Sequence, residues 1–132
     1  MKLSKNAKAV LLLLALAIVL GYLLTPLGLE TRTPDLRTVA IIPVFVSASL
    51  LIPITALILL FKRPRVTGAL VVINAIIMLL LVPGDQAGFF FTTPVPVAIT
   101  LCEFLSVIVS IGFLLYGPRL YAESKQDRKS VV

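Results

Sequence analysis

The sequence predicts an all-α integral membrane protein, an up-down bundle of four transmembrane helices with both termini in the cytoplasm. Apolar residues make up 59% of the 132 residues, charged residues only 14%, and the mean hydropathy is +1.10. A soluble domain of this size could not bury so much apolar surface, whereas a bilayer removes the need to bury it. The apolar residues form four long runs, and basic residues lie in short clusters between them, as flanks of membrane spans do.

Four runs are long and apolar enough to cross ~30 Å of hydrocarbon, at about residues 9–24, 38–61, 66–82 and 95–116. Basic residues followed by an apolar run also describe a signal peptide. The residues after the first run lack a convincing small-x-small cleavage site, so we expect a retained first helix.

Prolines and glycines interrupt or end the later runs. Pro43 and Pro53 lie within the second run. The pair Gly117-Pro118 follows the fourth run and is a stop signal for a helix. We therefore expect a single four-helix domain over residues 1–132, with residues 117–132 as a short cytoplasmic tail.

Lysine and arginine predict the orientation. Of 12 basic residues, three precede the first run, three lie in the link 62–65 and four follow the fourth run. Only Arg32 and Arg37 lie elsewhere, between the first two runs. Because basic residues stay in the cytoplasm, both termini and the link 62–65 are expected there, in a multi-pass protein of the cell membrane. Short links between consecutive spans predict antiparallel neighbours.

Glu103 is the one charged residue inside a predicted span. It lies roughly 10 Å from the outer end of the fourth span at the helical rise. A carboxylate there costs about 2.5–3.5 kcal/mol on insertion scales, so we expect it to face protein or water rather than lipid. Ser106 and Ser110 follow at i+3 and i+7 and form a polar stripe on the same helix face.

Two further spans supply candidate partners for this stripe. Asn74 lies at the centre of the third span. In the second span, Pro53 has no N–H to donate to the carbonyl of Ser49, which is then an acceptor near mid-bilayer. The predicted intramembrane polar site comprises Glu103, Asn74, Ser106, Ser110 and Ser49.

This site has two interpretations. In the first, Glu103 is a neutral, hydrogen-bonded group, and the small residues of its face let helices pack closely. In the second, Glu103 binds a proton or cation in a small oligomeric transporter or channel, because intramembrane carboxylates are functional by default. The chain has one such acid and no basic partner within the spans, so the first interpretation is favoured.

Composition argues against several other classes of protein. There is no His to act as a base or to bind haem, copper or zinc, and Cys102 is the only cysteine. With no nucleophile-base pair or metal set, we expect no enzyme and no cofactor. The net charge of +6 flanks the spans instead of forming a nucleic-acid surface, so the lipid bilayer is the expected partner and nucleic acid is not.

In length and span count the chain is similar to small multidrug transporters, holin-like proteins and accessory subunits of respiratory complexes. Small multidrug transporters carry a membrane Glu in their first span, whereas here it lies in the fourth, so that resemblance is one of size. We expect a non-catalytic accessory or assembly subunit that packs against other membrane helices, in a homo- or hetero-oligomer. The alternative is a proton- or cation-coupled transporter or channel that uses Glu103.

The orientation can be tested by cysteine labelling. A cysteine placed near Gly88 should react with a membrane-impermeant thiol reagent added outside intact cells, and one near Ser124 should not, because basic residues hold the tail in the cytoplasm. The reverse pattern would contradict the expected orientation.

Overall fold

The computed structural model of the protein describes the backbone of residues 3–31, 36–88 and 97–131, and the side chains of residues 3–23, 36–88 and 97–123. These residues form helices and no strand: α1 (Lys5–Thr31), a 3-10 turn η1 (Leu36–Thr38), α2 (Ile41–Val46), a π-helical turn η2 (Ser47–Leu51), α3 (Ile52–Leu60), α4 (Pro64–Gln86) and α5 (Val97–Val131). Residues 32–35 and 89–96, in the two expected outer loops, lie outside this description.

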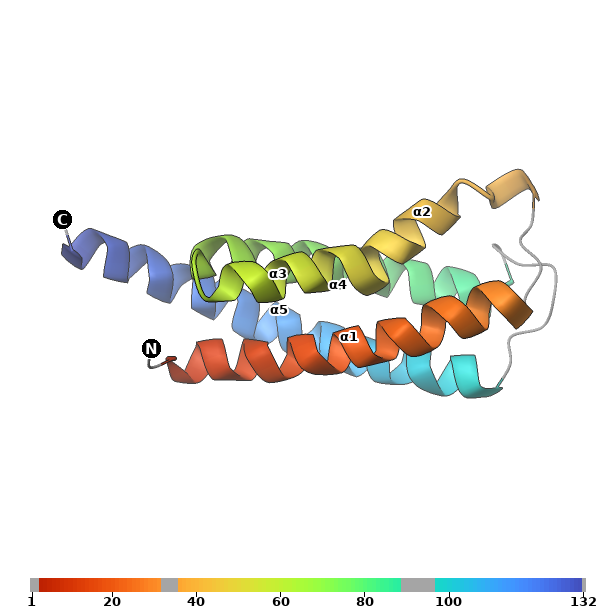
Figure 1. Ribbon diagram of the computed structural model, residues 1–132, viewed down its shortest axis with the longest axis horizontal. Coiled ribbons are helices and arrows are strands. Elements are labelled where there is room, and N and C mark those ends of the chain that lie inside the picture. Colours follow the sequence, from red (N-terminus) through yellow and green to blue (C-terminus); the bar gives the residue numbers. More distant parts are fainter. Residues whose placement is uncertain (1–2, 32–35, 89–96, 132) are drawn as a thin grey trace.

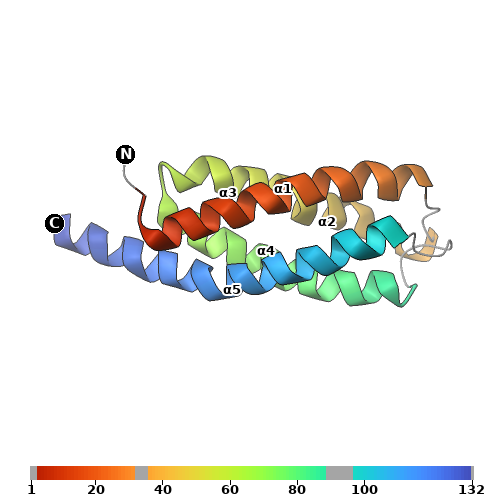
Figure 2. The ribbon, with the colours of Figure 1, turned by 90° about the horizontal axis from the view of Figure 1, so that it is seen from below.

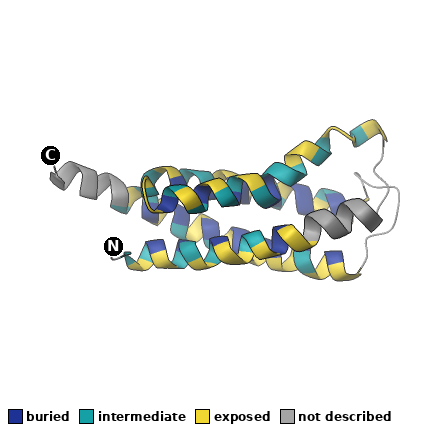
Figure 3. Ribbon diagram, viewed as in Figure 1, coloured by how far each residue is buried: buried dark blue, intermediate teal, exposed yellow. Residues whose placement is uncertain are grey.

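Four helices are long and apolar enough to span a membrane, which confirms that part of the prediction. They are Lys5–Leu23, Ile41–Leu60, Pro64–Gln86 and Val97–Glu123, and the second of them joins α2, η2 and α3. Large apolar side chains lie exposed along all four, including Leu12, Ile58, Leu80 and Phe104. Figure 3 shows exposed positions mainly on the outward faces of the helices and buried ones mainly where the helices face each other.

The helices pack in a ring of four. α1 packs against α3 and α5, and α4 packs against the same two helices. Consecutive spans run in opposite directions (Figures 1 and 2). One end of the bundle, here called the termini end, carries Lys5, the turn after Leu60 and the last turns of α5. The opposite end, here called the far end, carries Leu36, Gln86 and Val97.

The π-helical turn η2 explains how the second span accommodates Pro53. The backbone N–H of Ile52 donates to the carbonyl of Ser47, a five-residue step. Pro53 has no N–H for the Ser49 carbonyl, and this carbonyl lies against Gly21 of α1. A Cβ at Gly21 would overlap the carbonyl oxygen, so α1 can approach η2 this closely only because residue 21 is glycine.

The interface between α4 and α5, here called the α4–α5 seam, follows a 3.5-residue repeat. The buried positions alternate in steps of four and three residues along both helices. Such a repeat is typical of helices that cross at a small angle and pack knobs into holes. One such row comprises Thr67, Val71, Asn74, Met78, Leu81 and Asp85 in α4, and Ile99, Glu103, Ser106, Ser110, Phe113, Gly117 and Leu120 in α5. Gly68, Ala75, Val82 and Val109 are buried beside these rows. Gly68 lies against Gly117 of α5, whereas the Thr67 hydroxyl bonds the Ala56 carbonyl of α3.

Three helices are longer than the expected spans. Helix α1 continues through residue 26, α4 through Pro83 and α5 through Pro118. The expectation that Gly117 and Pro118 end the fourth helix is therefore wrong. A proline removes one backbone hydrogen bond, and exposed Pro118 places its ring away from the other helices. Gly117 has a packing role against α4, and the tail that follows is helical to Val131.

Gly68 of α4 and Gly117 of α5 bring the two backbones into contact near the termini end. A Cβ at Gly68 would lie 2.8 Å from the Gly117 carbonyl oxygen and 3.0 Å from the Tyr121 nitrogen. These are backbone atoms, which cannot rotate away. Gly112 differs, because a Cβ there would meet only the side chain of Leu13, at 2.8 Å from its nearest methyl carbon.

The two glycines therefore predict opposite effects of alanine. Gly68→Ala should destabilise the protein by about 1–3 kcal/mol, because the α4–α5 seam must open to admit the methyl group. Gly112→Ala should be neutral or stabilising, since Leu13 can move and alanine favours a helix by about 1 kcal/mol over glycine. Thermal unfolding in a mild detergent measures both. Equal midpoints for the two variants would contradict the backbone contact.

Candidate functional site

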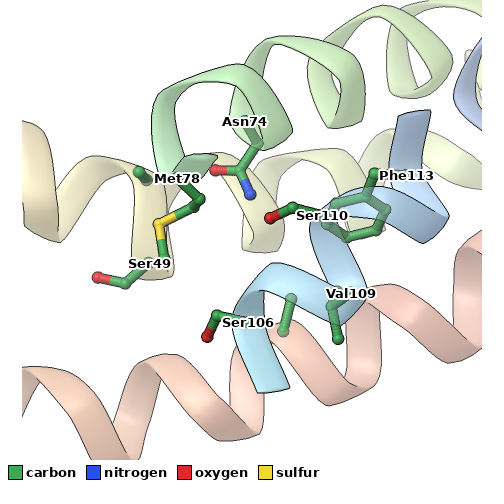
Figure 4. Close-up of a pocket in the computed structure, with 9 residues that line it drawn as sticks. Ser49, Asn74, Met78, Ser106, Val109, Ser110 and Phe113 are labelled. Atoms are coloured by element: carbon green, nitrogen blue, oxygen red, sulfur yellow. The ribbon is translucent and has the colours of Figure 1, made fainter. Parts of the chain in front are cut away.

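A small cavity lies inside the bundle between η2, α4 and α5, with α1 along one side (Figure 4). Its volume is about 20 Å³. Four of the five residues predicted from the sequence line it, and they come from three segments far apart in the chain. The lining residues are Ala17, Ala48, Ser49, Asn74, Met78, Ser106, Val109, Ser110 and Phe113.

Asn74 is the most polar group in the cavity wall. Its side chain is 3% exposed, and its Oδ1 atom accepts no hydrogen bond from the part of the chain that the structure describes. In Figure 4 the hydroxyl of Ser110 lies toward the Asn74 amide. A buried amide oxygen without a donor is uncommon in proteins and indicates a site where a donor belongs.

The hydroxyls of Ser49 and Ser106 donate their hydrogens to the backbone of their own helices. Ser106 Oγ donates to the Cys102 carbonyl at 2.9 Å, and Ser49 Oγ donates to the Phe45 carbonyl at 2.5 Å. A hydroxyl has one hydrogen and two lone pairs, so the Ser106 oxygen keeps the capacity to accept. The cavity wall is therefore richer in acceptors than in donors.

Glu103 lies outside this cavity, one helical turn from Ser106 toward the far end. Its side chain is fully buried. Gln86, at the end of α4, donates from Nε2 to Glu103 Oε2 at 2.5 Å, and the Thr100 hydroxyl lies 3.5 Å from Gln86 Oε1. The structure thus divides the predicted site into two parts. One is a cavity lined by uncharged side chains, and the other is the buried carboxyl group of Glu103, hydrogen-bonded to Gln86.

Asp85 is a second fully buried carboxyl residue, and sequence reasoning missed both it and Gln86. Both lie beyond residue 82, where the third span was expected to end, but α4 continues through Pro83 to Gln86. The signal that could have found Asp85 is the repeat of α4. Continued from Asn74 and Met78, its steps of three and four residues reach position 85 on the buried face.

The polar face of α5 is covered within the chain. Glu103, Ser106 and Ser110 all face α4, through Gln86 or through the cavity shared with Asn74. This face is therefore not free to pack on a helix of another protein. Among the described residues no cluster of three or more His, Cys, Asp or Glu side chains could hold a metal ion.

No protein-family model matches the chain, and comparison with curated proteins and with solved structures finds no match either.

The bond between Gln86 and Glu103 predicts a coupling that can be measured. Gln86→Leu should destabilise the protein by about 1–3 kcal/mol, because the buried Glu103 carboxyl loses the hydrogen bond from Gln86. In the double variant Gln86→Leu with Glu103→Leu the loss should be smaller than the sum of the two single losses, since neither side of this bond is then left without the other. Thermal unfolding of wild type, single variants and double variant gives the coupling energy. Additive effects of the two substitutions on stability would contradict the coupling between Gln86 and Glu103.

Proposed function

We propose that the protein is a small non-catalytic membrane protein that acts as an accessory or assembly subunit for other membrane helices. One observation carries this proposal: four of the five predicted polar residues surround a cavity of only about 20 Å³ inside the described part of the bundle. Pockets for small organic molecules occupy about 300–1,000 Å³. The bundle is therefore better suited to a packing role than to carrying an organic substrate between its helices.

The outer surface of α5 supports the proposed role. Its exposed positions are apolar over about ten residues, and Leu101, Phe104, Ile108 and Ile111 are each at least 50% exposed. Such a surface suits lipid chains or the helices of a partner, where association depends on van der Waals packing. The partner helices belong to a second copy or to another membrane protein.

We infer that both termini lie in the cytoplasm and that the protein is in the cell membrane. The supporting observation is that Lys5, Lys8, Lys62, Arg63 and Arg119 are all exposed at the termini end. Three of the four basic clusters of the sequence thus share one end of the bundle, as expected for the cytoplasmic side.

A second candidate function is proton- or cation-coupled transport, and the two buried carboxyl residues favour it. Asp85 and Glu103 are both fully buried, and each lies near the far end of the α4–α5 seam. Carboxyl groups inside a membrane domain are costly and commonly mark proton or ion pathways. In this function Glu103, which bonds exposed Gln86, would exchange a proton with water at the far side of the membrane.

Replacing Glu103 with glutamine separates the two functions. Glu103→Gln keeps the shape and much of the hydrogen-bonding capacity, but it cannot exchange a proton. If the protein is an accessory subunit, the variant should assemble as wild type does, and neither should support proton-driven flux in liposomes. Glu123→Gln is the matched control, because Glu123 bonds Asn6 at the termini end, away from the α4–α5 seam carboxyls.

Native electrophoresis of membranes and flux into liposomes are the two measurements. Flux in wild type and in Glu123→Gln that is lost in a well-folded Glu103→Gln variant would overturn the accessory-subunit proposal and establish transport. Migration of wild type as an isolated 14.3 kDa chain in native membranes would also contradict a subunit role.

A further inference from the structure

The cavity beside Asn74 has the size of a single water molecule. Its volume is about 20 Å³. A water molecule needs about 10–15 Å³ of such volume and two to four polar partners. The lining also contains apolar Met78, Val109 and Phe113, and the polar groups that face each other across the cavity are the Asn74 amide and the Ser110 hydroxyl (Figure 4).

The hydrogen-bonding groups of the wall match a molecule that both donates and accepts. Asn74 Oδ1 is buried and accepts no hydrogen bond from any described residue. Ser106 has given its hydrogen to the Cys102 carbonyl, so its oxygen can only accept a further bond. The Asn74 amide nitrogen and the Ser110 hydroxyl supply donors. A water molecule can donate to Asn74 Oδ1 and accept from the Ser110 hydroxyl.

Charge decides between water and a cation of similar size. No Asp or Glu lines the cavity, and Glu103 lies outside it. A cation held only by neutral oxygens in the membrane interior would be a buried charge without a counterion, which is far more costly than a buried neutral molecule. The lining therefore favours a neutral guest.

We propose that this cavity is a binding site for one structural water molecule, held by Asn74 and Ser110. The water links α4 to α5 at the middle of the α4–α5 seam, where the two helices have no direct side-chain hydrogen bond with each other at Asn74. It supplies the donor that the Asn74 oxygen needs, in a place where lipid can supply none. This proposal is independent of the proposed function.

The composition of the chain makes the test direct, because Asn6 and Asn74 are its only asparagines. Protein labelled with ¹⁵N in its asparagine side-chain amides gives two signals, one from Asn74 and one from Asn6. Asn6 lies partly buried at the termini end and bonds Glu123. In bilayers of deuterated lipid, magnetisation transfer from water in solid-state NMR should reach Asn74 although its side chain is 3% exposed.

Two valine variants control for the position of the water. Ser110→Val fills the cavity and removes a hydroxyl, so the transfer to Asn74 should be lost. Ser47→Val is the matched control, because Ser47 does not line the cavity and its hydroxyl bonds the Pro43 carbonyl. Transfer to Asn74 should persist in that variant, and the Asn6 signal should be unchanged in both.

The wild-type spectrum decides the proposal even if the Ser110→Val variant fails to fold. Absence of transfer to Asn74 in wild type, with transfer to Asn6 present, would overturn it. Transfer that persists in a folded Ser110→Val variant would place the water elsewhere and also overturn it. A shift of the Asn74 signal when sodium and potassium salts are replaced by choline chloride would identify the guest as a cation instead of water.

Discussion

Hydrocarbon provides no hydrogen-bond partner, and this constraint determines how the four helices are arranged. Glu103, Asn74, Ser106 and Ser110 cannot face lipid without a free-energy cost, so the face of α5 that carries three of them lies against α4. The 3.5-residue repeat keeps that face turned toward α4 along the whole seam. Gly68 and Gly117 then allow the two backbones to approach near the termini end. The remaining helices complete the ring around this pair.

The sequence predicts the parts of this structure that depend on local composition. Hydropathy locates the four helices, because a span must be apolar along its whole length. Helical spacing places Glu103, Ser106 and Ser110 on one face, and all three are buried. Four of the five predicted polar residues also meet at one cavity, because groups that avoid lipid have only the interior left to them.

The sequence does not predict what depends on packing between helices. A proline stops a helix by local rules, yet α4 and α5 continue through Pro83 and Pro118. For that reason Asp85 is buried, and Gln86 lies within hydrogen-bond distance of Glu103. The separation of Glu103 from the Asn74 cavity depends on the register of α4 against α5, which no single-helix pattern contains. Such a register is set by side-chain shape, above all where glycines bring two backbones together.

The two halves of the bundle have different interiors, and this difference affects how the molecule opens. The larger apolar cluster, with Val10, Leu14, Leu60, Val71 and Phe113, fills mainly the half toward the termini end. The far half holds the smaller cluster around Met78 and Leu81, together with the cavity and the buried carboxyl residues. Segments with fewer buried apolar contacts open locally at a lower free energy than the rest of a protein. Among the described residues the buried apolar contacts are fewer in the far half, so local separation of the helices should cost less free energy there than at the termini end.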